Sequence, residues 1–207
     1  MTNAQRFDTS RIGQQRAAMT AVPKSNRWIS PEEYLRGELK SEIRHEYFAG
    51  EVVAMAGASR NHNFIAGHIF SALDFHLAGK KCAPFINDMK AHIHRRGEDW
   101  FYYPDVMVDC DPAGQHEYYC ETPSVIFEVL SESTESKDRR EKRLAYEMLA
   151  TLHTYALVAQ DRRELLIFRR TSEGWSREVL PDEGEILRVP ELEFTLTLDA
   201  IYARTGL

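Results

Sequence analysis

The chain has 207 residues, of which 43% are hydrophobic and 28% are charged, so it is long enough for one well-buried α/β domain and short for two. No stretch approaches the ~20 apolar residues of a membrane span, and the polar N-terminal stretch lacks the apolar core of a signal peptide, so we expect a cytoplasmic protein. The net charge of −6 argues mildly against a nucleic-acid partner, but less so where carboxylates bind a metal ion that supplies positive charge.

The N-terminal part divides into an irregular and a structured segment. Residues 1–26 are polar without periodicity, so we expect a disordered tail there and a single domain over residues 27–207. The segment WISPEEYLRGEL predicts a helix, because Ser30 can cap it and Pro31 suits its first position. Glu33, three residues after the cap, completes a capping box.

Two short strands and a long helix follow. RHEYFAGEVVAMAG predicts strands that turn at Ala49-Gly50. The helix is predicted to begin at Asn61 and to end at Gly79. Its apolar residues at helical spacing are Phe64, Ile65, Ile69, Leu73 and Leu77. His62, in the first turn, could contact a phosphate, but we favour a capping role.

Three strands are predicted next, over residues 83–95, 99–111 and 122–133, each with side chains that alternate between two faces. A charged helix, KDRREKRLAYEMLA, comes after them, and two further strands, TYALVAQD and ELLIFRR, follow it. The predicted buried residues of the charged helix are Leu144, Met148 and Leu149. This order predicts an α/β (α+β) fold in which helices flank a mixed central sheet.

Neither the cysteines nor the histidines predict a zinc site. The three cysteines (Cys82, Cys110 and Cys120) are odd in number and lack paired spacing, so we expect free thiols in the core or near the surface. His92 and His94 alternate on an exposed strand end beside two arginines. We interpret them as a small basic patch, because no third ligand has suitable spacing.

Asp105 and Glu128 each stand within a run that otherwise predicts a buried strand. Isolated ionised carboxylates are costly to bury, so each of them needs a partner. Two acids on consecutive strands that face the same side of a sheet can share one hard divalent cation, Mg²⁺ or Mn²⁺. Such an ion would promote attack of water on a phosphoryl group. The alternative is that each acid pairs with Arg or Lys, or accepts backbone hydrogen bonds, without catalysis.

A nuclease site of this kind is completed by an acid–any–lysine pattern, because position i+2 of a strand faces the same way as the acid. Here that position is Leu130, so the positive charge must come from elsewhere. Lys142 lies in the helix after the acidic strand, and Lys90 would lie across from Asp105 if RRGED forms a hairpin turn. Lys142 could instead be a solvated helix charge paired with Asp138.

Four segments together resemble the restriction-endonuclease-like family called Uma-two: EYLRGELKSEIRHEYFAGEVVAMAGAS, YYPDVMVDCDP, FEVLSESTESKDRREKRLAYEML and YALVAQDRRELLIFRR. The matching segments run over about residues 30–202. The resemblance implies the PD-(D/E)xK nuclease fold with Asp105 and Glu128 as its acids. It also implies that the lysine has moved to the following helix, as Lys142.

The resemblance adds one further acid and two departures. Glu46 matches a recurrent acid of the family and would be an auxiliary acid of the site, whereas the alternative is a hairpin salt bridge with Arg44 or Arg60. Glu132 and Lys137 stand where family members usually carry Pro and Tyr, which bears on loop shape and substrate fit.

The charged helix carries the strongest basic cluster of the sequence, formed by Lys137, Arg139, Arg140, Lys142 and Arg143. The fold would place it near the acids, where a phosphate backbone would pass, although a solvated helix face is the alternative. We therefore predict a Mg²⁺- or Mn²⁺-dependent endonuclease that hydrolyses phosphodiester bonds in DNA, for which a homodimer would suit double-strand cutting. The alternatives are a nucleic-acid-binding or interaction module without catalysis and a hydrolase of another phosphate ester.

Overall fold

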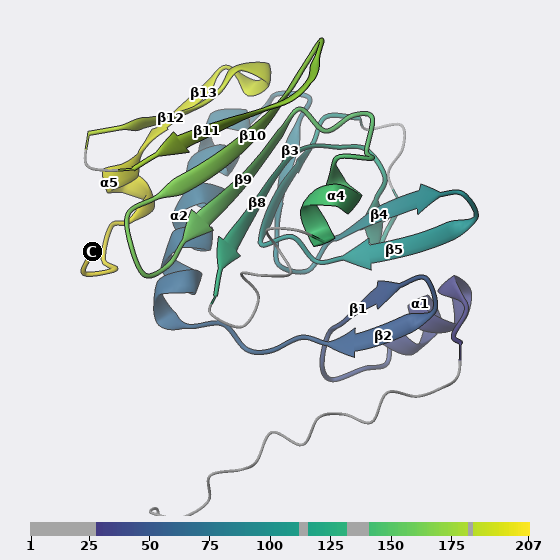
Figure 1. Ribbon diagram of the computed structural model, residues 1–207. Coiled ribbons are helices and arrows are strands. Elements are labelled where there is room, and N and C mark those ends of the chain that lie inside the picture. The colour runs from purple at the N-terminus through teal and green to yellow at the C-terminus, as the bar shows by residue number, and fades with distance from the viewer. Residues whose placement is uncertain (1–27, 112–115, 132–140, 182–183) are drawn as a thin grey trace, which may run out of the picture.

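The computed structural model describes residues 28–111, 116–131, 141–181 and 184–207 (Figure 1). The predicted tail therefore lies outside the described residues, and the assignment of one domain to residues 27–207 stays a prediction. No helix in the described part of the chain is long and apolar enough to cross a membrane.

An outer sheet of five strands has the order β2-β1-β5-β4-β7. Its strands are β1 (His45–Phe48), β2 (Glu51–Ala54), β4 (Lys90–Arg95), β5 (Glu98–Tyr102) and β7 (Tyr119–Cys120). Helix α1 (Pro31–Glu38) precedes this sheet, and the Ser30 hydroxyl accepts the Glu33 N–H at 3.2 Å, which confirms the predicted cap. The predicted β1–β2 turn is also confirmed, with positive φ at both Ala49 (44°) and Gly50 (105°).

The central sheet has six strands in the order β11-β10-β9-β8-β6-β3. These are β3 (Ala83–Ile86), β6 (Val106–Asp109), β8 (Pro123–Leu130), β9 (Thr154–Ala159), β10 (Leu165–Thr171) and β11 (Gly174–Leu180). Strands β8 and β9 are parallel and the other pairs are antiparallel, so the sheet is mixed, as predicted.

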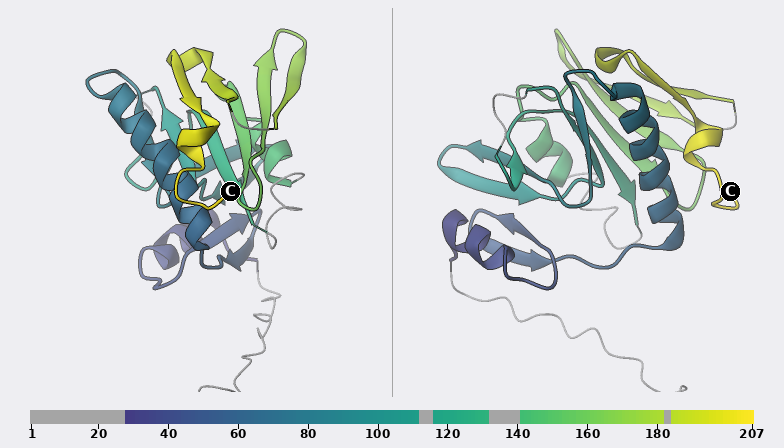
Figure 2. Two further views of the ribbon diagram at one scale, coloured as in Figure 1. Left: turned by 90° about the vertical axis from the view of Figure 1, so that its left-hand side faces the viewer. Right: turned by 180° about the vertical axis from the view of Figure 1, so that it is seen from behind.

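Helices cover both faces of the central sheet. Helix α2 (Arg60–Leu77) lies behind it and helix α4 (Arg143–Tyr146) in front of it, and the view from behind shows α2 crossing the strands (Figures 1 and 2). A two-stranded sheet of β12 (Ile186–Val189) and β13 (Phe194–Thr197), joined by the short helix η4 (Pro190–Leu192), packs with α5 (Leu198–Ile201) on the α2 side. This arrangement matches a restriction-endonuclease-like fold.

Strand β8 contributes to a separate hydrophobic core on each face. Phe127 packs in the core that contains Ile65 and Ile69 of α2, whereas Ile126 packs in the core that contains Tyr146 of α4. The alternation predicted for residues 122–130 is therefore confirmed. Each fully buried side chain of this kind contributes about 1.5–3 kcal/mol to folding.

Two predicted strands are in fact divided between the two sheets. Residues 83–95 form β3 in the central sheet and β4 in the outer one, and the chain changes sheet at Asn87, whose φ is 58°. Residues 99–111 likewise form β5 and β6, separated at Tyr103–Asp105. Asn tolerates the left-handed region and Pro104 lacks a backbone N–H, so both interruptions have a local cause.

The expectation of three free thiols is wrong for two of them. Cys82 and Cys110 form a disulfide with Cα atoms 4.0 Å apart. The register that pairs Ala83 with Asp109 in β3 and β6 brings the two cysteines opposite each other. Their separation of 28 residues does not reveal this pairing in the sequence. Cys120 is free and buried, and burial raises the pKa of its thiol to about 12.

The charged helix differs from its prediction in its buried face. Its described helical part is α4, and residues 132–140, with Asp138 and three members of the basic cluster, lie outside the described residues. Leu144 is 59% exposed, whereas Ala145, Tyr146 and Leu149 are buried. The helix turns Lys142 and Tyr146 toward β8, and this rotation leaves Leu144 on the outside.

Candidate active site

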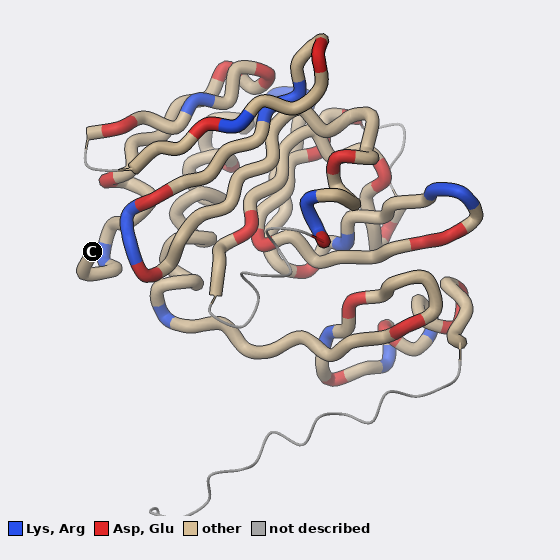
Figure 3. Tube along the Cα trace, viewed as in Figure 1, with Lys and Arg blue, Asp and Glu red and all other residues tan. Residues whose placement is uncertain are grey.

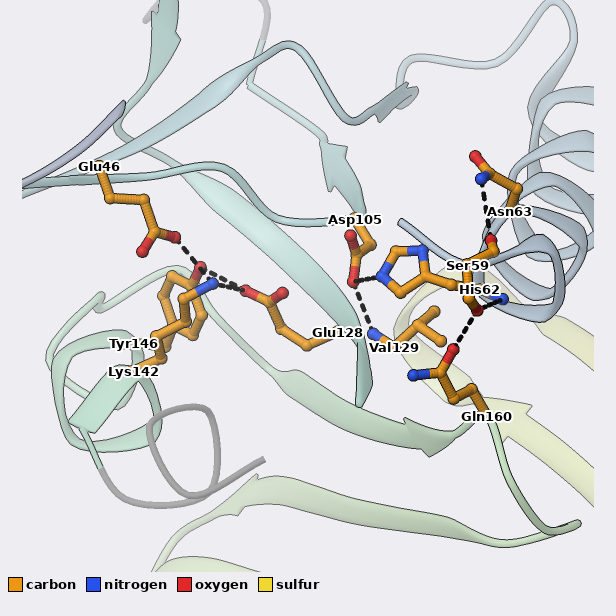
Figure 4. A network of polar contacts seen from close by, with 10 residues as sticks. All are labelled: Glu46, Ser59, His62, Asn63, Asp105, Glu128, Val129, Lys142, Tyr146 and Gln160. Carbon is orange, nitrogen blue, oxygen red and sulfur yellow. Dashed lines mark hydrogen bonds and ion pairs between the residues drawn. The ribbon is translucent and has the colours of Figure 1, made fainter. Parts of the chain in front are cut away.

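Glu128 lies in the middle of β8 and points toward α4 (Figure 4). Its Oε1 accepts a hydrogen bond of 2.8 Å from the Tyr146 hydroxyl and lies 3.2 Å from the Lys142 Nζ. Burial raises the pKa of Tyr146 well above its ordinary value, and the charge of Glu128 adds to this effect. Tyr146 therefore stays protonated and remains a hydrogen-bond donor to the carboxylate.

Lys142 joins Glu128 to a second acid from the other sheet. Its Nζ lies 2.8 Å from Glu46 Oε1 of β1, and the side chains of Lys142, Glu46 and Glu128 are 6%, 7% and 3% exposed. We call Glu46, Glu128, Lys142 and Tyr146 the lysine–carboxylate cluster. The burial of Lys142 contradicts the alternative of a solvated helix charge, and its two acids compensate the hydration that the ammonium loses on burial.

Glu46 does not form either of the hairpin salt bridges considered as its alternative. Arg44 pairs with Asp88, and the Arg60 guanidinium lies over the Phe64 ring at 5.2 Å. The contact of Glu46 with Lys142 crosses from the outer sheet to the helix that follows β8. The family acid and the helix lysine are thus brought together.

Asp105 lies next to Glu128 across the sheet but makes different contacts. It directly precedes β6, where Val106 pairs with Phe127, so its backbone lies opposite Glu128. Its Oδ2 accepts a 2.6 Å hydrogen bond from the Val129 N–H and lies 3.2 Å from the His62 Nε2. Figure 4 shows Glu128 directed to Lys142 and Asp105 directed to His62. The bend after Pro104 takes Asp105 out of the ladder and allows this orientation.

The N-terminus of α2 holds His62 in place. The helix begins at Arg60, and its cap is Ser59, whose hydroxyl accepts the His62 N–H at 3.1 Å. The capping role proposed for His62 is therefore wrong, because its imidazole contacts Asp105 instead. Ser59 also donates a hydrogen bond to Gln160 after β9, which ties the helix end to the central sheet.

Lys90, the other candidate lysine, lies elsewhere. The predicted hairpin is confirmed, since Arg95 pairs with Glu98, but the register places Lys90 beyond the pair of Ala91 and Tyr102. Its Nζ donates to the Tyr118 carbonyl at 3.3 Å and lies 5.0 Å from the Tyr103 ring centre. Burial lowers the pKa of Lys90. Of the two lysines, Lys142 is the one that contacts Glu128.

Among the described residues, the charges outside this site do not identify a nucleic-acid surface. Figure 3 shows basic residues interspersed with acidic ones along β10 and β11 and at the β4–β5 tip. Arg143, the other described member of the basic cluster, pairs with Glu147 at 3.2 Å and lies over the Phe168 ring. That a phosphate backbone passes along the basic cluster, next to the acids, therefore stays a prediction.

The acids fit a hard divalent cation. Asp105, Glu128 and Glu46 offer oxygen donors, and the two glutamates beside the single Lys142 ammonium leave a local excess of negative charge. Within the described ranges, these acids do not form a group of three ligands within 4.8 Å of one another. Two side-chain ligands nevertheless suffice for Mg²⁺, which usually retains waters and takes substrate phosphate oxygens.

Sequence reasoning missed three contacts of the site. The spacing of four residues places Tyr146 on the helix face of Lys142, but its hydrogen bond to Glu128 was not predicted. The Val129 N–H and His62 reach Asp105 through long-range packing that leaves no local pattern.

The interpretation of His92 and His94 as a basic patch is also wrong, because both rings contact Asp99.

Comparisons with known proteins agree with this arrangement. A family model, Uma2, described as "Putative restriction endonuclease", matches residues 31–200. The "Uncharacterized protein slr1290" of Synechocystis sp. is 31% identical over 175 residues, which cover 84% of this chain and 91% of that protein. The "Uncharacterized protein sll1609" of the same organism is 29% identical over 142 residues, or 67% of this chain and 79% of that protein.

Solved structures share the fold, and one of them illustrates the likeness. It is described as "a putative nuclease belonging to DUF820 from Anabaena variabilis", and it superposes with a TM-score of 0.67 at 16% identity. The match covers 83% of this chain and 96% of the other. At this identity the likeness concerns the fold alone.

Proposed function

The chain belongs to the Uma2 family of restriction-endonuclease-like proteins, and from this premise we propose that it is a Mg²⁺- or Mn²⁺-dependent endonuclease that hydrolyses phosphodiester bonds in DNA. The contact between Lys142 and Glu128 is the main support for this proposal. Leu130 occupies the usual lysine position of the strand, yet Lys142 reaches Glu128 at 3.2 Å from the following helix. The acid–lysine contact of a nuclease site is thereby restored from a different element.

Asp105 and Glu128 would hold the metal ion. Asp105 directly precedes β6 and its backbone lies opposite Glu128 of β8, so both acids would contribute oxygen ligands. When bound, such an ion supplies Lewis-acid charge that polarises the phosphoryl group and favours ionisation of water.

The other residues would position these groups. Lys142 carries a buried ammonium whose charge can stabilise negative charge that develops on the phosphate oxygens. Glu46 orients this ammonium, and Tyr146 fixes one oxygen of Glu128. His62 and the Val129 N–H restrict the rotation of the Asp105 carboxylate.

Cleavage of supercoiled plasmid DNA in Mg²⁺ or Mn²⁺ tests the proposal. Asp105→Asn keeps an acceptor for the Val129 N–H but loses the charge, so we expect a rate at least about 100-fold lower. Asp109→Asn is the matched control, because Asp109 is a buried acid at the end of β6, the strand that follows Asp105, and its Oδ1 accepts from Thr122 instead. Equal cleavage by wild type and Asp105→Asn would refute the assignment.

A binding module without catalysis is the second candidate. It is favoured by the position of Lys142, whose ammonium is held by two glutamates and would have to be shared with a phosphate. This candidate predicts salt-sensitive DNA binding that persists in chelator, with no cleavage in either metal. Analytical ultracentrifugation with and without DNA would show whether the chain forms the homodimer that suits double-strand cutting.

A further inference from the structure

The β4–β5 hairpin gathers two imidazoles and a carboxylate on one face. His92 and His94 are two residues apart on β4 and so point the same way. The register places Asp99 of β5 directly opposite His94. The hairpin turn at Arg96-Gly97 thus supplies the third group from only five residues further along the chain.

The three side chains converge on one oxygen. Asp99 Oδ1 lies 2.7 Å from His92 Nε2 and 2.8 Å from His94 Nδ1. The ligand atoms of the three residues lie within 4.8 Å of one another, and no other group of three or more His, Cys, Asp or Glu among the described residues does so. We call these residues the hairpin histidine cluster.

Phe101 and Glu121 orient the imidazole of His92. The His92 ring stacks on Phe101 at 4.3 Å with planes 2° apart. Its other nitrogen, Nδ1, lies 2.9 Å from Glu121 Oε1. A histidine that binds a metal usually gives its second ring N–H to a carboxylate in this way, which fixes the tautomer and increases its basicity. His92 is therefore preset to present Nε2 toward Asp99.

We propose that the hairpin histidine cluster binds a borderline divalent transition-metal ion of the Zn²⁺ class. The ligands are His92 Nε2, His94 Nδ1 and an Asp99 oxygen, and a water completes a tetrahedron. Two imidazoles favour Zn²⁺ over Mg²⁺, which prefers oxygen donors. Insertion of the ion requires the ligand atoms to separate by about half an ångström, given Zn–N bonds of about 2.0–2.1 Å. His94 can make this movement because its side chain is 59% exposed.

This site is separate from the lysine–carboxylate cluster. Tyr47, Phe101 and His92 form a row of cross-strand neighbours on one face of the outer sheet. Glu46 precedes Tyr47 on β1 and therefore points to the other face, where it meets Lys142. An ion at the hairpin would link β4 to β5 and, through Glu121, to the segment after β7.

Titration calorimetry with Zn²⁺ into the full chain tests the site. The wild type is expected to bind one Zn²⁺ more tightly than His94→Ala does, by at least about 10-fold. Glu121→Gln, which changes only the partner of His92, should lose about 10-fold. His153→Ala is the control, because His153 is an exposed histidine outside the cluster. Circular dichroism verifies that each variant is folded.

Two results would overturn the proposal. One is an absence of Zn²⁺ binding by the wild type, which would leave the cluster as a hydrogen-bond network only. The other is an identical Zn²⁺ affinity in wild type and in His94→Ala. A parallel titration with Mg²⁺ is expected to be unaffected by either cluster variant.

Discussion

The lysine–carboxylate cluster and the hairpin histidine cluster contain similar numbers of charged groups but differ in how far these groups are buried. The first is assembled from β1, β8 and α4, and its Lys142 side chain is 6% exposed. The second comes from one hairpin, and its His94 side chain is 59% exposed. Buried charges need compensation inside the protein, whereas exposed ones exchange their partners with water. The folded structure therefore depends on the first cluster far more than on the second.

The largest effect is expected from Lys142→Met. It removes the ammonium from between Glu46 and Glu128 and leaves two buried carboxylates without their cation. We expect the free energy of unfolding to fall by about 3–5 kcal/mol, as when one partner of a buried ion pair is lost. Urea denaturation in chelator measures this loss.

Lys90→Met is the matched control for that experiment. Lys90 is also buried, but its ammonium contacts the Tyr118 carbonyl and the Tyr103 ring rather than two acids. The expected loss is about 1 kcal/mol or less. An equal fall in the free energy of unfolding in Lys142→Met and Lys90→Met would contradict the claim that the fold depends on the contact of Lys142 with two acids.

An intermediate effect is expected from Tyr146→Phe. The variant keeps the ring in the core but removes the 2.8 Å hydrogen bond to Glu128. A hydrogen bond to a charged group contributes about 1.5–3 kcal/mol, and we expect a loss in that range. Leu144→Ala on the exposed side of the same helix should change stability by about 0.5 kcal/mol or less. A Tyr146→Phe protein as stable as the Leu144→Ala protein would indicate that the hydrogen bond from Tyr146 to Glu128 does not stabilise the fold.

A smaller stability effect, with a larger effect on cleavage, is expected from His62→Ala. His62 acts through Asp105 and is a positioning residue, so we expect unfolding to become easier by about 1 kcal/mol and plasmid cleavage to slow about 10-fold. His62→Gln retains a donor and should recover part of the rate. A cleavage rate that falls only in proportion to the folded fraction would mean that His62 is merely structural.

The smallest effect is expected from Asp99→Asn, and it should depend on pH. Although burial raises the pKa of Asp99, the hydrogen bonds from His92 and His94 lower it below its ordinary value of 3.8. A lowered carboxyl pKa stabilises the fold above the ordinary value, and this contribution disappears as the pH falls through the folded pKa. Thermal denaturation in chelator should therefore show a difference from wild type at pH 7 that becomes smaller as the pH falls below 3.8.

The same contrast explains what the sequence could predict. Local patterns identified the Ser30 cap, the Ala49-Gly50 turn and the two faces of β8. They could also have identified the hairpin histidine cluster, because alternation together with a two-residue turn brings Asp99 opposite His94. The spacing of His92, His94 and Asp99 along the chain does not resemble a metal site; only the pairing across the hairpin brings the three together.

Local sequence patterns do not predict which strands pair with each other. Alternation assigns a residue to a face but does not say which strand lies beside it. The change of sheet at Asn87 moved Lys90 away from Asp105, and the pairing of β3 with β6 joined Cys82 to Cys110. The contact between Lys142 and Glu46 likewise depends on how the outer sheet docks against α4.

The central claim, that Asp105 and Glu128 bind a hard divalent cation beside Lys142, is tested most directly by Mn²⁺ titration calorimetry. The titration is made in the His94→Ala background, so that the hairpin histidine cluster does not contribute. We predict that Glu128→Gln abolishes the Mn²⁺ binding heat, whereas Asp109→Asn on the neighbouring strand retains it. Equal Mn²⁺ heats in the Glu128→Gln protein and its parent would contradict the metal site and the nuclease mechanism that depends on it.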